Sequence, residues 1–217
     1  LAADNAACLE GFPTREALAG LDVLVLDNIP AAGLSLRQRR DVLDFVEAGG
    51  SLLVLGGWYA LSKGAYEGSF LEDALPVRCR QATYLRRLTA EQGRIRPTPA
   101  YRERLAADPP DLGEGFAVEW ACHVQPKPGA EVLAAAGEVP LLIAGTVGKG
   151  RVAAWAGSHS GRPEAPYWRS RGWPVLLADV LKHLAAGSEA VAPPDPAVAE
   201  RIAKAIEALS MADLAAQ

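Results

Sequence analysis

Cysteine and histidine supply most nucleophiles and metal ligands in proteins, and this 217-residue sequence holds three of each. They are Cys8, Cys79, Cys122, His123, His159 and His183. The cysteines are odd in number and form no Cys-x-x-Cys pair, so neither a disulfide framework nor a structural zinc site is predicted. The histidines match no metal-binding spacing. We therefore expect no metal and no cofactor, and we interpret the cysteines as buried thiols, as free cysteine commonly is.

Three further places combine groups that could act in acid–base or nucleophilic catalysis. The serines and the histidine of Ser158-His159-Ser160 are adjacent, but a catalytic triad is a spatial arrangement that adjacency does not create. We interpret this segment as a polar loop, with His159 the best candidate for a site histidine. In Cys122-His123 we expect a buried thiol beside an exposed imidazole. Ser62 is interpreted as a serine on the surface or at the cap of a helix.

Aromatic side chains gather in the last third of the sequence, at Trp155, Tyr167, Trp168 and Trp173. Rings of this kind can stack on sugars, but they more often lie in the core or at its rim. A carbohydrate ligand is therefore kept as an alternative.

Composition excludes several classes of protein. Half of the residues are hydrophobic and 22% are charged, which is not the composition of a disordered chain. The formal net charge is −4, so there is no broad basic surface for a nucleic acid. Apolar runs such as Leu52–Leu55 are far too short to span a bilayer. The N-terminus lacks the features of a signal peptide. We expect a cytoplasmic protein, or a soluble domain of a larger, membrane-associated one.

A β-α-β unit is predicted in the first third of the sequence. Leu21–Asp27 and Ser51–Leu55 are short apolar runs, typical of parallel strands buried on both faces. Between them, Ser35 is a good N-cap and Gln38 stands at the capping-box position, so a helix should begin here. Gly49-Gly50 should end that helix.

The rest of the sequence combines clear secondary-structure patterns with a region that has none. The pattern indicates a short helix at 71–75, an irregular region over 78–115, strands at 131–136, 140–146 and 151–156, and a helix at 173–186. Val147–Gly150 should be a tight hairpin turn, since the Gly-Lys-Gly within it leads into a strand and not into the helix of a phosphate loop. The apolar stripe of the late helix is expected at Val175, Leu176, Val180, Leu181 and Leu184. Residues 188–196 read as a Pro-rich linker, and 197–217 as a C-terminal segment with an amphipathic helix.

Four stretches together resemble one family. They are 21–28 (LDVLVLDN), 44–57 (DFVEAGGSLLVLGG), 66–77 (YEGSFLEDALPV) and 140–155 (PLLIAGTVGKGRVAAW). In order and spacing, over about residues 12–186, they resemble the class I glutamine amidotransferase-like superfamily. The similar branch is the one called "putative glutamine amidotransferase", which is related to the trehalose-utilisation-like proteins.

The resemblance implies a flavodoxin-like, doubly wound, mostly parallel α/β sheet with helices on both faces and a late antiparallel hairpin. Ligands of such sheets bind beyond the carboxyl ends of the strands. The candidate ligand-binding residues are therefore Asp27, Asn28, Gly56, Gly57, Trp58, Tyr59, Ser62 and His159.

The resemblance also indicates which catalytic residues of the family this sequence lacks. Active members carry a cysteine at a tight strand-to-helix elbow, completed by a His-x-Glu pair. Here Trp58 stands at the elbow position, and His159 is followed by Ser160, Gly161 and Arg162. Because tryptophan cannot attack a carbonyl, we expect no glutaminase triad and no catalytic residue.

Three functions remain open at this point. The first is a non-catalytic amidotransferase-like domain that binds a small molecule or assists assembly, with the backbone N–H groups of its Gly-Gly elbow free to hold an anion. The second is a carbohydrate-active hydrolase or lyase that uses Asp27, His159, and Ser62 or Glu72. The third is a structural module that forms a homo-oligomer or packs on the remainder of a longer polypeptide. The domain over 1–187 is expected to lack a first β-α-β portion of about 50 residues, the usual size of such a unit.

Overall fold

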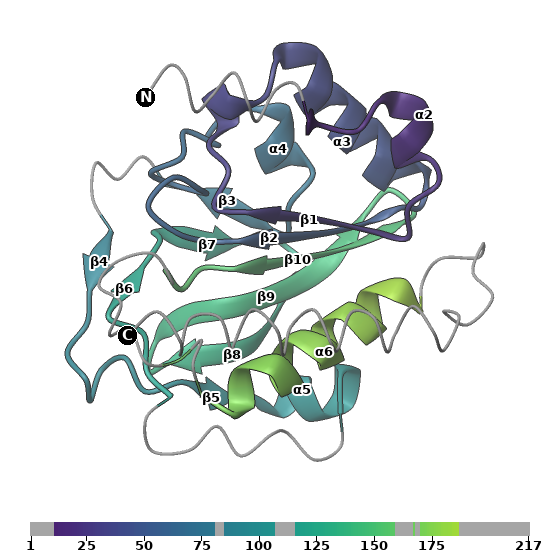
Figure 1. Ribbon diagram of the computed structural model, residues 1–217. Coiled ribbons are helices and arrows are strands. Elements are labelled where there is room, and N and C mark those ends of the chain that lie inside the picture. The colour runs from purple at the N-terminus through teal and green to yellow at the C-terminus, as the bar shows by residue number, and fades with distance from the viewer. Residues whose placement is uncertain (1–10, 81–84, 107–115, 159–166, 168–169, 187–217) are drawn as a thin grey trace, which may run out of the picture.

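The computed structural model of the chain describes residues 11–80, 85–106, 116–158, 167 and 170–186. Its main sheet has the strand order β1-β2-β10-β9-β8-β5 (Figure 1). The strands are β1 (Val23–Asp27), β2 (Ser51–Leu55), β5 (Arg96–Pro97), β8 (Glu131–Ala136), β9 (Val139–Val147) and β10 (Gly150–Trp155). β2 pairs in parallel with both β1 and β10, whereas β9, β8 and β5 continue the sheet in antiparallel fashion. The predicted α/β fold and its late hairpin are confirmed.

Helices cover both faces of this sheet (Figure 1). On one face lie α2 (Arg15–Leu18), α3 (Leu36–Ala48) and α4 (Phe70–Asp73), and on the other α5 (Pro99–Arg104) and α6 (Gly172–Ala185). A short 3-10 helix, η1 (Ala31–Gly33), follows β1. The alternating side chains of β2 join the two layers, since Leu52 and Val54 belong to the core under α3, and Leu53 and Leu55 to the core under α6. β2 is buried along its whole length, as predicted.

Four short strands, which come partly from the region predicted as irregular, form an arm beside the sheet. β3 (Val77–Cys79) pairs with β7 (Val124–Pro126), and β4 (Arg86–Arg87) pairs with β6 (Trp120–Ala121). We call β3, β4, β6 and β7, with the residues that continue them, the arm. Both pairs are antiparallel and join segments more than 30 residues apart. The consequence is that β6 and β7 lie near the end of β10, where Cys122 N donates to the Ala156 carbonyl at 2.7 Å.

Helix α3 begins as the sequence predicts. Gln38 N donates to Ser35 Oγ at 3.2 Å, and Ser35 N donates to Gln38 Oε1 at 2.8 Å. This reciprocal capping box satisfies two of the backbone N–H groups that a helix start leaves unpaired. The helix ends at Ala48, next to the predicted Gly49-Gly50 pair.

The turn between β9 and β10 packs closely on the end of α3. Lys149 N donates to the Glu47 carbonyl at 3.2 Å. A Cβ atom on Gly150 would lie 2.2 Å from the Gly50 carbonyl oxygen and 2.3 Å from that of Val46. The Gly-Lys-Gly motif is therefore a tight turn fitted to a helix end, as predicted.

Two predictions of burial are wrong. β1 was expected to be buried on both faces, yet its pattern alternates and Val25 is 42% exposed. β1 lies at one edge of the sheet and has a neighbouring strand on one side only. Val175, predicted in the apolar stripe of α6, is likewise exposed, whereas Leu176, Val180 and Leu184 are buried.

Several predictions fall on residues outside the described ones. They concern Cys8, the Pro-rich linker, the C-terminal helix and any β-α-β portion before Leu1. These stay predictions. In the described part of the chain, no helix has the length and apolarity needed to cross a bilayer.

Candidate functional site

The carboxyl ends of β1, β2 and β10 meet at one edge of the sheet. Asn28 N donates to the Leu55 carbonyl at 3.0 Å, and Gly56 N donates to the Trp155 carbonyl at 2.7 Å. These two bonds place Asp27-Asn28, Gly56-Gly57 and the residues after Trp155 side by side. Three of the sequence-predicted positions are thereby brought to a common edge, where ligands of doubly wound sheets bind.

Asn28 fixes the segment that follows β2. Its backbone is left-handed, with φ of 51°, a conformation that asparagine tolerates better than most residues. Its side-chain Oδ1 accepts a hydrogen bond from Tyr59 N at 2.8 Å. Asn28 is thus a positioning residue for the backbone at Tyr59, whose ring is 50% exposed. Asp27, at the end of β1, is exposed.

The strand-to-helix elbow of active family members is not reproduced after β2. Residues 57–65 form successive turns, and no α-helix is found among the described residues between β2 and α4. Leu61 and Ala65 have φ of 53° and 57°, and such left-handed residues interrupt a right-handed helix. The buried Leu61 side chain anchors this path in the core.

The backbone N–H of Gly56 was expected to be free to bind an anion, but it is not free. It donates to the Trp155 carbonyl. A Cβ atom at position 56 would lie 2.5 Å from that carbonyl oxygen, so the close approach of the two strands requires glycine. The Gly56 N–H is therefore occupied by a sheet contact, and the expectation that it is free to hold an anion is wrong.

Trp58, at the elbow position, packs against a residue from the arm. Its ring centroid lies 5.6 Å from that of Trp120 on β6, with the planes inclined by 49°. Lys63 Nζ lies 3.8 Å from the Trp58 ring centroid, and Arg87 Cζ lies 5.5 Å from the Trp120 centroid. Both are within cation–π range. We call these four residues the tryptophan–cation cluster.

Sequence reasoning missed three members of the tryptophan–cation cluster: Lys63, Arg87 and Trp120. Lys63 lies in the turns that follow β2. Arg87 and Trp120 come together through the pairing of β4 with β6. No local pattern in the sequence marks that pairing, because each strand has only two residues.

The Cys122 thiol lies next to the elbow but is not poised as a nucleophile. Its Sγ lies 3.7 Å from the Gly57 carbonyl oxygen and 3.9 Å from that of Ala60. Burial raises the pKa of the Cys122 thiol to about 12, although the hydrogen bonds with Gly57 and Ser62 act to lower it. A thiol with this pKa is protonated near neutrality, and the thiolate is the reactive form. The prediction of buried thiols is confirmed for Cys79 and Cys122.

The side chains of Ser62 and Glu72 accept hydrogen bonds from backbone N–H groups. Ser62 is buried, and its Oγ accepts from His123 N at 3.1 Å, so the prediction of a helix-surface serine is wrong. Glu72 Oε1 accepts from Cys79 N, and Oε2 from Gly68 N, each at 2.7 Å. Both side chains tie the segment after β2 to its neighbours.

Of the remaining predicted site residues, some lie in the core and others lie outside the described residues. Trp155 Nε1 donates to the Tyr167 hydroxyl at 3.2 Å, and both rings contact Trp173, so these aromatics are core residues, as favoured by the sequence. Ser158 is buried, and its N–H donates to the Trp120 carbonyl at 2.7 Å. His159 and Trp168 lie outside the described residues. Within the described ranges, no cluster of three or more His, Cys, Asp or Glu could hold a metal ion.

A sheet with helices on both faces and a site edge at the carboxyl ends of its parallel strands defines a flavodoxin-like α/β protein. Residues 3–186 match the family described as "Putative glutamine amidotransferase". The chain belongs to this family.

Solved structures agree with this fold. Cytoplasmic protein STM3548 from Salmonella typhimurium is 17% identical with a TM-score of 0.73, over 83% of this chain and 78% of that one. Cytoplasmic protein STM1381 from Salmonella typhimurium LT2 is 22% identical with a TM-score of 0.65, over 83% of this chain and 85% of that one. At these identities the similarity establishes the fold. No curated protein matches the chain in sequence.

Proposed function

We propose that this chain is a non-catalytic glutamine amidotransferase-like domain that binds a small ligand at the carboxyl ends of β1, β2 and β10. The observation that carries the proposal is Trp58. It stands at the position of the family's nucleophile, and there it packs against Trp120 and Lys63. An indole cannot form an acyl intermediate, but it can offer an apolar surface to a ligand.

The state of the cysteines supports the absence of glutaminase chemistry. Burial raises the pKa of both the Cys79 and Cys122 thiols. The neighbouring Glu72 carboxylate adds to the rise at Cys79. A catalytic cysteine needs the opposite environment, one that stabilises the thiolate.

The exposed groups at this edge favour a ligand with both a ring and a negative charge. Tyr59 is half exposed, Trp58 is partly so, and the exposed Lys63 holds its ammonium over the Trp58 ring. Aromatic faces suit sugar rings, and a lysine ammonium suits a carboxylate. A sugar acid combines the two. We extend the proposal to a cytoplasmic location, which the names of both Salmonella neighbours support.

The carbohydrate-active enzyme is less well supported than the binding domain. It would draw on Ser62 and Glu72, whose side-chain oxygens already accept hydrogen bonds from backbone N–H groups. Freeing either one would leave a backbone donor without its partner.

Two measurements test the proposal. The first is release of ammonia from L-glutamine, where we expect no rate above that of the Cys79→Ala/Cys122→Ala variant. A rate that disappears in Cys122→Ala would overturn the non-catalytic assignment. The second is a thermal shift with D-glucuronate, compared with D-glucose. We expect a saturable shift with glucuronate that is weakened in Lys63→Met and Tyr59→Ala.

Lys149→Met is the matched control, since Lys149 is an exposed lysine at the β9–β10 turn, at the other end of β10. A shift that Lys149→Met reduces as much as Lys63→Met does would reflect net charge and not a site.

A further inference from the structure

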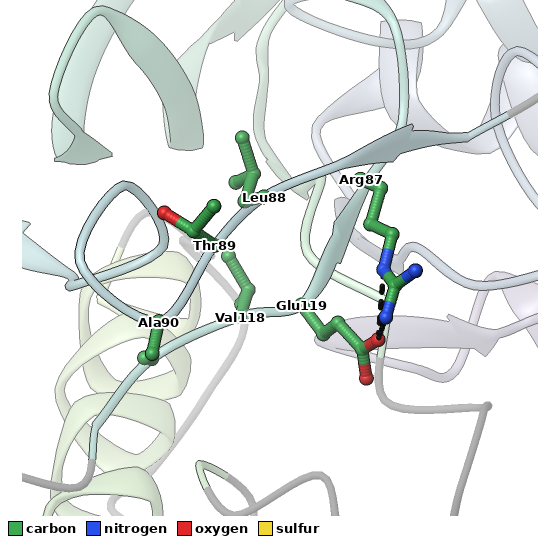
Figure 2. A pocket seen from close by; sticks show the side chains of 7 residues that line it. Arg87, Leu88, Thr89, Ala90, Val118 and Glu119 are labelled. Atoms are coloured by element: carbon green, nitrogen blue, oxygen red, sulfur yellow. Dashed lines mark hydrogen bonds and ion pairs between the residues drawn. The ribbon is translucent and has the colours of Figure 1, made fainter.

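A cavity of about 540 Å³ lies on the arm, and one of its lining residues, Arg87, also belongs to the tryptophan–cation cluster. Its walls are residues 87–90, which continue β4, and residues 117–119, which lead into β6 (Figure 2). Two backbone bonds hold the walls together. Leu88 N donates to the Glu119 carbonyl at 2.8 Å, and Val118 N donates to the Gly93 carbonyl at 3.0 Å. The cavity is therefore framed by paired backbone.

The lining is mainly apolar and fixed in place. Leu88 and Val118 are buried and belong to the core under α6. Ala90 and Ala117 add small apolar side chains. The loop after Leu88 is held by a reciprocal pair, in which Thr89 N donates to Gln92 Oε1 at 3.1 Å and Gln92 N donates to Thr89 Oγ1 at 3.2 Å. A preformed, mostly apolar hollow with few polar groups is the usual form of a small-molecule site.

The charged groups of the lining are Arg87 and Glu119, whose side chains meet at one end of it (Figure 2). Arg87 Nη2 lies 3.1 Å from Glu119 Oε1, and Arg87 Nε lies 3.2 Å from the same oxygen. A fork-to-fork pair would engage both carboxylate oxygens. Here the guanidinium converges on Oε1, so the contact does not use Glu119 Oε2 or the remaining N–H groups of Arg87.

This ion pair can be exchanged for ligand contacts at little cost. The Arg87 side chain is 69% exposed and that of Glu119 is 34% exposed, and ion pairs exposed to this degree contribute little to stability. Trp120 holds the guanidinium in position from its other side. The cavity thus presents a positioned cation and an adjacent anion beside an apolar wall.

We propose that this cavity binds the zwitterion of an α-amino acid with an apolar side chain. The carboxylate would accept from the Arg87 guanidinium, and the ammonium would donate to Glu119. An α-amino acid carries its two charges on neighbouring groups, which matches an arginine and a glutamate already in contact. Its side chain would lie against Ala90 and Ala117, the accessible apolar residues of the lining. This site is separate from the edge described under Proposed function and does not depend on it.

Calorimetric titration of the full chain tests whether binding requires both the carboxylate and the ammonium of the ligand. The probes are L-leucine, 4-methylpentanoate, which lacks the ammonium, and 3-methylbutylamine, which lacks the carboxylate. We expect saturable binding of L-leucine, and affinity lower by about tenfold or more for each partial ligand, because each leaves one charge of the pair unmatched. Absence of leucine binding at millimolar concentration, or equal binding of the three probes, overturns the proposal.

Substitutions then locate the site. Arg87→Gln and Glu119→Gln should each weaken leucine binding by about tenfold or more, as expected when one charged partner is removed. Arg86→Gln is the matched control, since Arg86 is the exposed neighbour on β4 and does not line the cavity. A loss in Arg86→Gln equal to that in Arg87→Gln would contradict the assignment. The near-ultraviolet circular dichroism of each variant reports whether its fold is intact.

Lys63→Met separates this site from the edge near Trp58. We expect Lys63→Met to leave leucine binding unchanged. If it abolished leucine binding, the amino acid would lie at the elbow edge and the cavity assignment would be wrong. Loss of glucuronate binding with retention of leucine binding would overturn the proposed function alone.

Discussion

The indole of Trp58 contacts the indole of Trp120 across 62 residues of sequence, with ring centroids 5.6 Å apart. This contact joins the turns after β2 to the arm. The pair should therefore be measurable as a coupling between these two segments, which the His123 N–Ser62 Oγ hydrogen bond also joins.

A double-mutant cycle on Trp58→Ala and Trp120→Ala measures that coupling. We expect the double variant to lose about 1 kcal/mol less stability than the sum of the singles, the usual size of an aromatic pair interaction. Urea unfolding of the four proteins gives the value. A cycle on Trp58 and Tyr101 is the control, because Tyr101 lies in the core under α6. Additivity in the first cycle would mean that the indoles do not interact.

Gly56→Ala should destabilise the fold by about 1–3 kcal/mol, the range for overpacking a filled site. The added Cβ would lie 2.5 Å from the Trp155 carbonyl oxygen, which is backbone and cannot rotate away. Gly11→Ala is the control, since nothing lies within 4 Å of its Cβ position. Its effect should stay within about 0.5 kcal/mol. Comparable losses in the two variants would contradict the close strand approach.

The stability that Cys122 contributes should fall at alkaline pH. Burial raises the pKa of this thiol from 9.0 to about 12 in the folded state, so the unfolded state releases its proton first. As pH rises from about 9 toward about 12, the free energy of unfolding should drop by about 1 kcal/mol per pH unit relative to Cys122→Ala. Below pH 9 the difference between the two proteins should be flat. A flat difference throughout would mean that the thiol is solvated.

Ser35→Ala should cost about 1 kcal/mol of stability, because it removes the N-cap acceptor of α3. Ser35→Thr keeps the hydroxyl and should retain most of that stability. Gln38→Ala should be milder, since it removes only the reciprocal bond to Ser35 N. Thermal unfolding followed by circular dichroism ranks the three variants. The same loss in Ser35→Thr as in Ser35→Ala would show that the hydroxyl is not the cap.

The sequence predicted those parts of the fold whose signals are local. Ser35 with Gln38, the buried run of β2 and the turn before Gly150 each carry their information within a few residues. The turns after Gly57 were not predictable, because Leu61 and Ala65 adopt a left-handed backbone conformation that their residue types do not favour. Val25 was predicted buried because composition does not tell an edge strand from a central one.

The candidate site was predictable only in outline. Strand ends near Asp27 and Gly56 follow from the β-α-β pattern, and the structure brings them together. Arg87, Trp120 and Glu119 could not be found in this way, since they meet through pairings between distant two-residue strands. Their arrangement depends on tertiary packing, which the periodicity of a single segment does not reveal.

The fit of the β9–β10 turn against the end of α3 restricts where this molecule can change shape. With carbonyl oxygens of Val46 and Gly50 in the space that a Gly150 side chain would need, helix and hairpin cannot slide past one another. That end of β10 behaves as a fixed base. The opposite end carries the turns of residues 57–65 and the arm, which are joined to the sheet by side chains and single backbone bonds. Adjustment to a ligand at the elbow edge would accordingly be a movement of the turns of residues 57–65 about a stationary helix and hairpin.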